Sequence, residues 1–114
     1  MRLPKAAHTM SWVILFVAGV MEVFWALMLK QSDGLTKPAY TAAFVVGLVV
    51  SMGLLSQAIK VLPVGTAYAV WTGIGAAGTA IFGMLWLDEP RDAIKLVSLV
   101  LLIAGIIGLR LSAE

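Results

Sequence analysis

Four long apolar stretches, separated by short polar segments, constrain this chain more than any other feature of its sequence. They cover about residues 11–30, 39–59, 63–87 and 92–110. Each has roughly the 20 residues that a helix needs to cross the hydrocarbon core of a bilayer. None alternates apolar and polar residues as barrel strands do, and only helices or closed barrels satisfy their backbone in lipid. The sequence therefore predicts an all-α membrane protein with four transmembrane helices.

Composition agrees with lipid as the main solvent. The 114 residues are 61% hydrophobic and 12% charged, against about 25% charged in soluble domains. Cysteine is absent and the single histidine, His8, lies in the polar N-terminal segment, so neither a disulfide nor a transition-metal centre is expected. The basic residues form no dense cluster, which argues against nucleic acid as a partner. We expect the bilayer as partner and no cofactor.

Turn-forming and capping residues lie where the apolar stretches begin and end. The candidates are Gly34 after the first helix, Pro38 and Pro63 at the starts of the second and third, and Asp92 before the fourth. Residues 1–10 are interpreted as a polar N-terminal extension. Residues 11–111 then form a single four-helix transmembrane domain.

Lysine and arginine are divided evenly between the two sides that four helices define. The side of the N-terminus holds Arg2, Lys5, Lys60 and Arg110, and the other side holds Lys30, Lys37, Arg91 and Lys95. The positive-inside rule then prefers neither orientation. If translation starts at Met10, the balance becomes two against four, a mild bias. An even balance predicts dual topology and an antiparallel homodimer, the symmetry of inverted-repeat transporters.

Glu22 is the residue most informative about function. It lies about 16 Å along the first predicted helix, at 1.5 Å per residue, and so near the middle of the bilayer. A charged group there costs about 2.5–3.5 kcal/mol on insertion scales, and such residues usually line a pathway for ions or protons. The alternative is a permanently protonated side chain that hydrogen-bonds a neighbouring helix.

Trp25 lies three residues after Glu22 and therefore on the same helix face. It is too deep for the aromatic belt at the membrane interface. Its role is either plain packing or, beside the carboxylate, orienting Glu22 through the indole N–H and facing a cation with its ring.

The third helix carries an aromatic face, made by Gly65, Tyr68, Trp71, Thr72 and Gly75. This face is either a packed seam or the wall of a cation site, with the Tyr68 hydroxyl reaching the carboxylate of Glu22. Gly73 and Gly75 either allow a helix bend or permit close helix contact.

Ser51 has two interpretations, and two further pairs of residues have one each. Ser51 in the second helix either hydrogen-bonds the carboxylate or its ligand, or bonds its own backbone. Gly105 and Gly108 are assigned to dimer packing, because small residues let helices approach closely in lipid. The Asp88–Glu89 pair is interpreted as a solvated loop.

These residues together resemble the small multidrug resistance family. The resemblance covers roughly residues 10–111, and its signatures are the central glutamate of the first helix and the segment Gly65–Gly75. The segment from Glu22 to Lys30, with Trp25 three residues after the glutamate, is similar to the guanidinium-exporter subtype. The resemblance implies an antiparallel dimer in the bacterial inner membrane and a transporter rather than an enzyme.

By the same resemblance, Glu22 binds either protons or substrate, and four more residues line its site: Trp25, Ser51, Tyr68 and Trp71. The expected function is a proton-coupled antiporter that exports guanidinium or small guanidinyl cations. Three alternatives stay open at this point. One is an exporter of larger aromatic or quaternary ammonium cations, the second is a membrane subunit that only packs against a partner, and the third is a passive cation channel without proton exchange.

Overall fold

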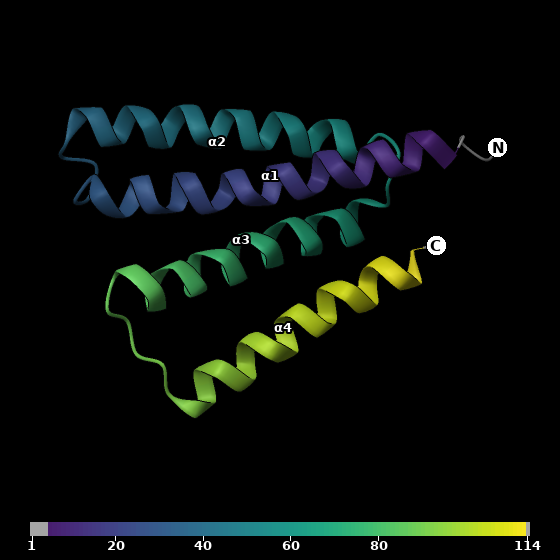
Figure 1. Ribbon diagram of the computed structural model, residues 1–114. Helices are drawn as coiled ribbons and strands as arrows, with labels where there is room; N and C mark the ends of the chain where they lie inside the picture. Colours follow the sequence, from purple (N-terminus) through teal and green to yellow (C-terminus); the bar gives the residue numbers. More distant parts are fainter. Residues whose placement is uncertain (1–4, 114) are drawn as a thin grey trace.

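Four long helices make up nearly all of the part of the chain that the structure, a computed structural model, describes, namely residues 5–113 (Figure 1). They are α1 (Lys5–Gln31), α2 (Pro38–Ala58), α3 (Val64–Trp86) and α4 (Ala93–Ser112). All four are long and apolar enough to cross a membrane. The prediction of an all-α protein with four membrane-spanning helices is therefore confirmed.

In space the helices lie in the order α2, α1, α3 and α4, and they form an open fan rather than a closed bundle. In Figure 1, α1 and α2 lie side by side and antiparallel, and α3 runs along the other side of α1. Helix α4 begins away from α3 after their connecting loop and approaches it toward the C-terminal end. Contacts between helices join α1 to α2, α1 to α3 and α3 to α4, with a weaker contact between α2 and α3. Helix α1 is thus the central element, and α4 packs mainly against α3, with Arg110 stacked on Trp12 of α1.

The first helix begins at Lys5 rather than near Ser11. The sequence between these positions contains neither proline nor glycine, so nothing in it interrupts a helix. The structure therefore places residues 5–10, expected as part of a separate extension, in the first turns of α1. The other three helices begin and end within two residues of the expected positions.

The helix starts follow the expected chemistry. Pro38 occupies the first turn of α2, where its missing N–H costs nothing. Pro63 takes the N-cap position of α3 instead of its first turn. Asp92 caps α4, because its Oδ1 accepts a hydrogen bond of 2.9 Å from the backbone N–H of Lys95. In the turn after α1, Gly34 has φ +70°, the left-handed conformation that glycine adopts without strain.

The core lies where α1, α2 and α3 meet. The core cluster joins Leu15 and Ala18 of α1 to residues of α2 and α3, with Trp71 among them. Helix α4 has no buried residue, and its outer face presents large apolar side chains. In water such a surface would aggregate, whereas in lipid it needs no covering.

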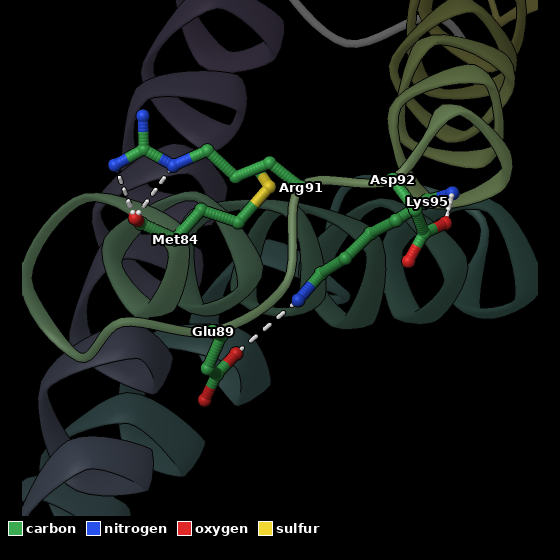
Figure 2. A network of polar contacts seen from close by, with 5 residues as sticks. All are labelled: Met84, Glu89, Arg91, Asp92 and Lys95. Carbon is green, nitrogen blue, oxygen red and sulfur yellow. Dashed lines mark hydrogen bonds and ion pairs between the residues drawn. The ribbon is translucent and has the colours of Figure 1, made fainter.

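The loop between α3 and α4 is held by a local polar network (Figure 2). The Arg91 side chain donates two hydrogen bonds to the carbonyl of Met84, from Nε at 3.0 Å and Nη2 at 2.7 Å. Lys95 Nζ lies 3.3 Å from Glu89 Oε1. These contacts satisfy one of the carbonyls in the last turn of α3 and fix where the loop carboxylate lies relative to the helix.

Candidate functional site

Glu22 opens onto a hollow of about 370 Å³ between α1 and α3. Its lining comprises Glu22, Trp25 and Ala26 from α1, Thr72, Gly75, Ala76, Thr79 and Ala80 from α3, and Glu89 from the following loop. Small residues dominate the α3 side, which is what leaves room between the two helices. The hollow is large enough for a small organic cation.

The carboxyl group of Glu22 lies directly against Gly75. A Cβ atom added at Gly75 would collide with the carboxyl group and with the Cγ of Glu22. Only glycine leaves this space, so the residue types at the two positions are coupled. The register continues along the helices, because a Cβ at Gly78 would meet Val23. Helices α1 and α3 are therefore parallel at the site, and successive residues of α1 face successive positions of α3.

Three buried polar atoms at the site have no hydrogen-bond partner. Among the described residues, the buried side-chain atoms without a partner are Glu22 Oε1, Trp25 Nε1 and Thr79 Oγ1. All three residues line the same hollow. An unpaired buried polar atom costs roughly 1–3 kcal/mol, so three such atoms around one space indicate a site built to hold something polar.

The position of Trp25 is set by α2. Its ring packs edge-on against Phe44, with ring centroids 5.8 Å apart. A Cβ at Gly47 would lie 3.0 Å from Trp25 Cβ, so this glycine allows α2 to approach closely. The Trp25 ring thus packs against α2, while the residue also lines the hollow and its indole N–H is buried without a partner. The two interpretations of Trp25 are not exclusive.

Ser51 and Trp71 form a separate buried pair beside the hollow. Trp71 Nε1 donates to Ser51 Oγ at 3.0 Å, and Ser51 donates to the carbonyl of Ala18 at 2.7 Å. Neither residue lines the hollow. Ala18 lies one turn before Glu22 on α1, so the pair ties α2 and α3 to the helix that carries the carboxylate.

The expected hydrogen bond from Tyr68 to Glu22 is not formed in this structure. Glu22 Oε1 has no partner, and Tyr68, 57% exposed, instead packs its ring against Trp71 at 5.7 Å. The reason is position along the helix. Gly75 faces the carboxylate, and Tyr68 lies seven residues earlier on α3, about two turns away.

Four of the glycines singled out in the sequence, Gly73, Gly75, Gly105 and Gly108, fall into two groups. Gly73 and Gly75 lie at close helix contacts, since a Cβ at Gly73 would reach within 2.9 Å of Ile106. The close-contact interpretation therefore accounts for both, and the bend stays a prediction. Gly105 and Gly108 have open space around them on the exposed side of α4.

Besides three alanines, two lining residues with polar side chains, Thr79 and Glu89, were not singled out as site residues from the sequence. Thr79 is one turn beyond Gly75, and that spacing could have indicated it once Gly75 was placed against Glu22. Glu89 is exposed as expected for a loop residue, yet it also borders the hollow. Its position depends on the path of the loop shown in Figure 2, which no pattern in the sequence specifies.

A second hollow lies near the ends of the chain and has a different character. It measures about 310 Å³ and its lining is apolar except for Arg110. The Arg110 guanidinium stacks on the ring of Trp12 at 4.6 Å. A resident cation and the absence of carboxylates from this lining make the space unsuitable for a cationic ligand.

Four membrane-spanning helices and a carboxylate that faces a hollow within the membrane define the class of small multi-pass membrane transporters. Residues 10–102 match the sequence profile described as Small Multidrug Resistance protein. The chain belongs to this family, whose members are multi-pass proteins of the bacterial inner membrane.

Similar proteins span almost the same length. A guanidinium exporter of Salmonella typhimurium is 54% identical over 105 residues, which are 92% of this chain and 100% of that protein. A guanidinium exporter of Proteus vulgaris is 51% identical over 104 residues, 91% of this chain and 100% of that protein. One from Citrobacter freundii is 52% identical over 105 residues, with the same coverage as the Salmonella protein. The predicted resemblance is thus confirmed.

Proposed function

We propose that this protein exports guanidinium across the bacterial inner membrane in exchange for protons, with Glu22 as the shared binding group. The observation that carries the proposal is the buried, unpartnered Oε1 of Glu22 at the hollow between α1 and α3. The relatives named guanidinium exporters, at 51–54% identity over their whole length, support the choice of cation.

The chemistry of the lining suits guanidinium. Guanidinium is planar, weakly hydrated and presents parallel N–H donors that match the two oxygens of a carboxylate. Trp25, which lines the same hollow, offers an aromatic face on which a planar cation stacks. Its bulk also disfavours the larger aromatic and quaternary ammonium cations, which lack the N–H fork and need more room.

Coupling to protons follows from competition for one group. A protonated Glu22 offers neither the charge nor both oxygen acceptors that the cation needs. Cation and proton therefore exclude one another, and each must leave before the other binds. If the empty carboxylate does not cross the membrane, each cation that moves out is matched by protons that move in.

An antiparallel homodimer supplies the second half of the pathway. Helix α4 has no fully buried residue within one chain, and Gly105 and Gly108 have open space around them. Two antiparallel copies can pack through this face and bring two Glu22 side chains to one cavity. Rocking of the two copies would then expose that cavity to each side of the membrane in turn.

Ser51, Tyr68 and Trp71 are assigned a supporting part. The bonds from Trp71 to Ser51 and from Ser51 to Ala18 hold three helices together one turn from Glu22. Tyr68 packs on Trp71 and is exposed on the monomer, where a partner subunit or a cation in the dimer cavity can meet it. Within one chain these residues thus support the helix that carries the carboxylate and do not line the hollow itself.

The test is transport by the purified protein in liposomes that enclose a pH-sensitive dye. External guanidinium should enter and drive protons out, whereas a bulky quaternary ammonium ion should drive little or no proton movement. The Glu22→Gln variant should stay folded and dimeric and give no coupled flux. Full guanidinium-driven proton movement by Glu22→Gln would disprove the role of the carboxylate. Absence of guanidinium transport by the unchanged protein would disprove the substrate.

A further inference from the structure

Thr79 departs from the usual behaviour of a hydroxyl in a membrane helix. Helical serine and threonine side chains in lipid commonly donate to a carbonyl one turn back. Thr41 does so to the carbonyl of Lys37 at 2.9 Å, and Ser56 does so to the carbonyl of Gly53 at 2.9 Å. The Thr79 hydroxyl is buried and makes no such bond. Its oxygen is thus available to another group.

The register of α1 and α3 places this hydroxyl next to the carboxylate site. Glu22 lies against Gly75, and Val23 lies against Gly78. Thr79 follows Gly75 by four residues and therefore projects from the same face of α3, one turn further on. Trp25 follows Glu22 by three residues on α1. Because α1 is parallel to α3, Trp25 also lies about one turn further on. The three residues that carry the unpartnered polar atoms consequently line one hollow.

Guanidinium has more donors than one carboxylate can satisfy. Two N–H groups from two of its nitrogens form the fork on the carboxylate, and the third nitrogen points its two N–H groups away. In a partly dry hollow those remaining donors need acceptors, because an unpaired donor on a charged group is costly. Trp25 Nε1 cannot serve, since an indole N–H only donates. The hydroxyl oxygen of Thr79 can accept.

We propose that Thr79 is a cation-contacting residue that accepts a hydrogen bond from the third nitrogen of a guanidinium held on Glu22. This inference rests on the proposed function, because it assumes that the hollow binds guanidinium. It deepens that proposal by giving a reason for selectivity. Cations that present donors on one edge only would satisfy Glu22 and leave Thr79 unpaired.

The experiment compares two cations in three variants, by direct binding to purified protein at fixed pH. Guanidinium carries donors on all three nitrogens, whereas N,N-dimethylguanidinium keeps the fork and has no donor on the third nitrogen. Thr79→Val replaces the hydroxyl by a methyl group of similar shape, and Thr79→Ser keeps a hydroxyl. Thr41→Val is the matched control, because it makes the same replacement at a hydroxyl outside the hollow.

Thr79→Val should weaken guanidinium binding about tenfold, the scale of one hydrogen bond to a charged group. It should leave dimethylguanidinium binding within about twofold, so that the preference for guanidinium collapses. Thr79→Ser should restore most of that preference, and Thr41→Val should change neither affinity. Thr79→Ala, which also lacks the hydroxyl, should repeat the valine result and serves if valine does not fold.

Two results would overturn the inference. Equal weakening of both cations by Thr79→Val would mean that the hydroxyl acts on Glu22 rather than on the cation. Unchanged binding of both cations would mean that the hydroxyl does not take part. In either case the unchanged protein still binds guanidinium, so the proposed function survives. Failure of the unchanged protein to bind guanidinium would instead remove the proposed function itself.

Discussion

The indole N–H of Trp71 donates a hydrogen bond to Ser51 Oγ at 3.0 Å, and the Ser51 hydroxyl in turn donates to the carbonyl of Ala18 at 2.7 Å. Both Ser51 and Trp71 are buried, at 0% and 6% exposure. The relay links α3 through α2 to α1, one turn from Glu22. The Trp71 N–H has Ser51 Oγ as its acceptor, so removal of the Ser51 hydroxyl would leave the buried indole N–H unsatisfied.

Ser51→Ala should therefore destabilise the protein. The loss is expected to be about 1–3 kcal/mol, because the Trp71 N–H would remain buried without an acceptor. Thermal unfolding in detergent measures it. Adding Trp71→Phe to Ser51→Ala should cost less than the sum of the single changes, as expected for residues that share one bond.

Ser56→Ala is the matched control for that change. Ser56 lies on the same helix, is exposed, and bonds only the carbonyl of Gly53. Its loss should stay within about 0.5 kcal/mol, as is usual for surface positions. If Ser51→Ala were no more harmful than Ser56→Ala, the relay would not contribute to stability.

Guanidinium affinity should fall as the pH falls. Proton and cation compete for Glu22, so acid favours the protonated side chain and disfavours the cation. For each proton displaced, the apparent affinity changes by up to about tenfold per pH unit in the range where the group titrates. Titration of guanidinium into purified protein at a series of pH values measures this slope. Any binding left in Glu22→Gln should show no such slope, and a slope that survives in this variant would place the competition at another group.

Gly75→Ala should impair transport far more than folding. The added Cβ would collide with the carboxyl end of Glu22, a flexible side chain that can rotate away. The helix itself gains, because alanine favours a helix by about 1 kcal/mol over glycine. We expect a melting temperature near that of the unchanged protein and a transport rate at least about tenfold lower, equal to ~1.4 kcal/mol at the site.

Gly53→Ala tests whether that effect is specific. No atom lies within 4 Å of a Cβ built at Gly53, on the adjacent helix α2. This variant should transport normally. Equal loss of transport in both variants would indicate that helix flexibility, rather than contact with Glu22, explains the need for glycine.

Much of the fold was predictable because lipid imposes simple rules on sequence. Length and apolarity alone indicate four helices, and the caps at Pro38 and Asp92 follow from local chemistry. The start of α1 was missed because no local signal separates a polar helical turn, such as residues 5–10, from a polar tail. Only the absence of a helix breaker pointed the other way.

The site was less predictable than the fold. Helical spacing placed Glu22 and Trp25 on one face of the first helix, and both residues line one hollow. It could not set the register between α1 and α3, which decides that Gly75 lies against the carboxylate and that Thr79, rather than Tyr68, lines the hollow. Register between membrane helices depends on the fit of small and large side chains along the whole contact. A single sequence does not reveal that fit.

Dual topology can be tested by labelling single cysteines, because the chain has none of its own. Asp88→Cys and Ala113→Cys place exposed thiols at opposite ends of the helices. With an antiparallel dimer, about half of each variant should react in intact cells with a reagent that does not cross the membrane. Full labelling of one variant and none of the other would show a single orientation and exclude the antiparallel homodimer.

Glu89→Gln should slow capture of the cation without abolishing transport. Glu89 borders the hollow that contains Glu22, yet it is exposed, so its charge attracts cations toward the opening rather than binding them tightly. We expect a KM for guanidinium higher by about two- to fivefold and a nearly unchanged maximal rate, with the effect fading at high salt. Lys95→Gln should act in the opposite direction, because Lys95 Nζ lies 3.3 Å from Glu89 Oε1 and offsets its charge. Asp88→Asn removes the same charge from a neighbouring exposed position that does not line the hollow, and its effect should be smaller. If Asp88→Asn and Glu89→Gln raised the KM equally, the general charge of the loop, and not the position of Glu89, would be responsible.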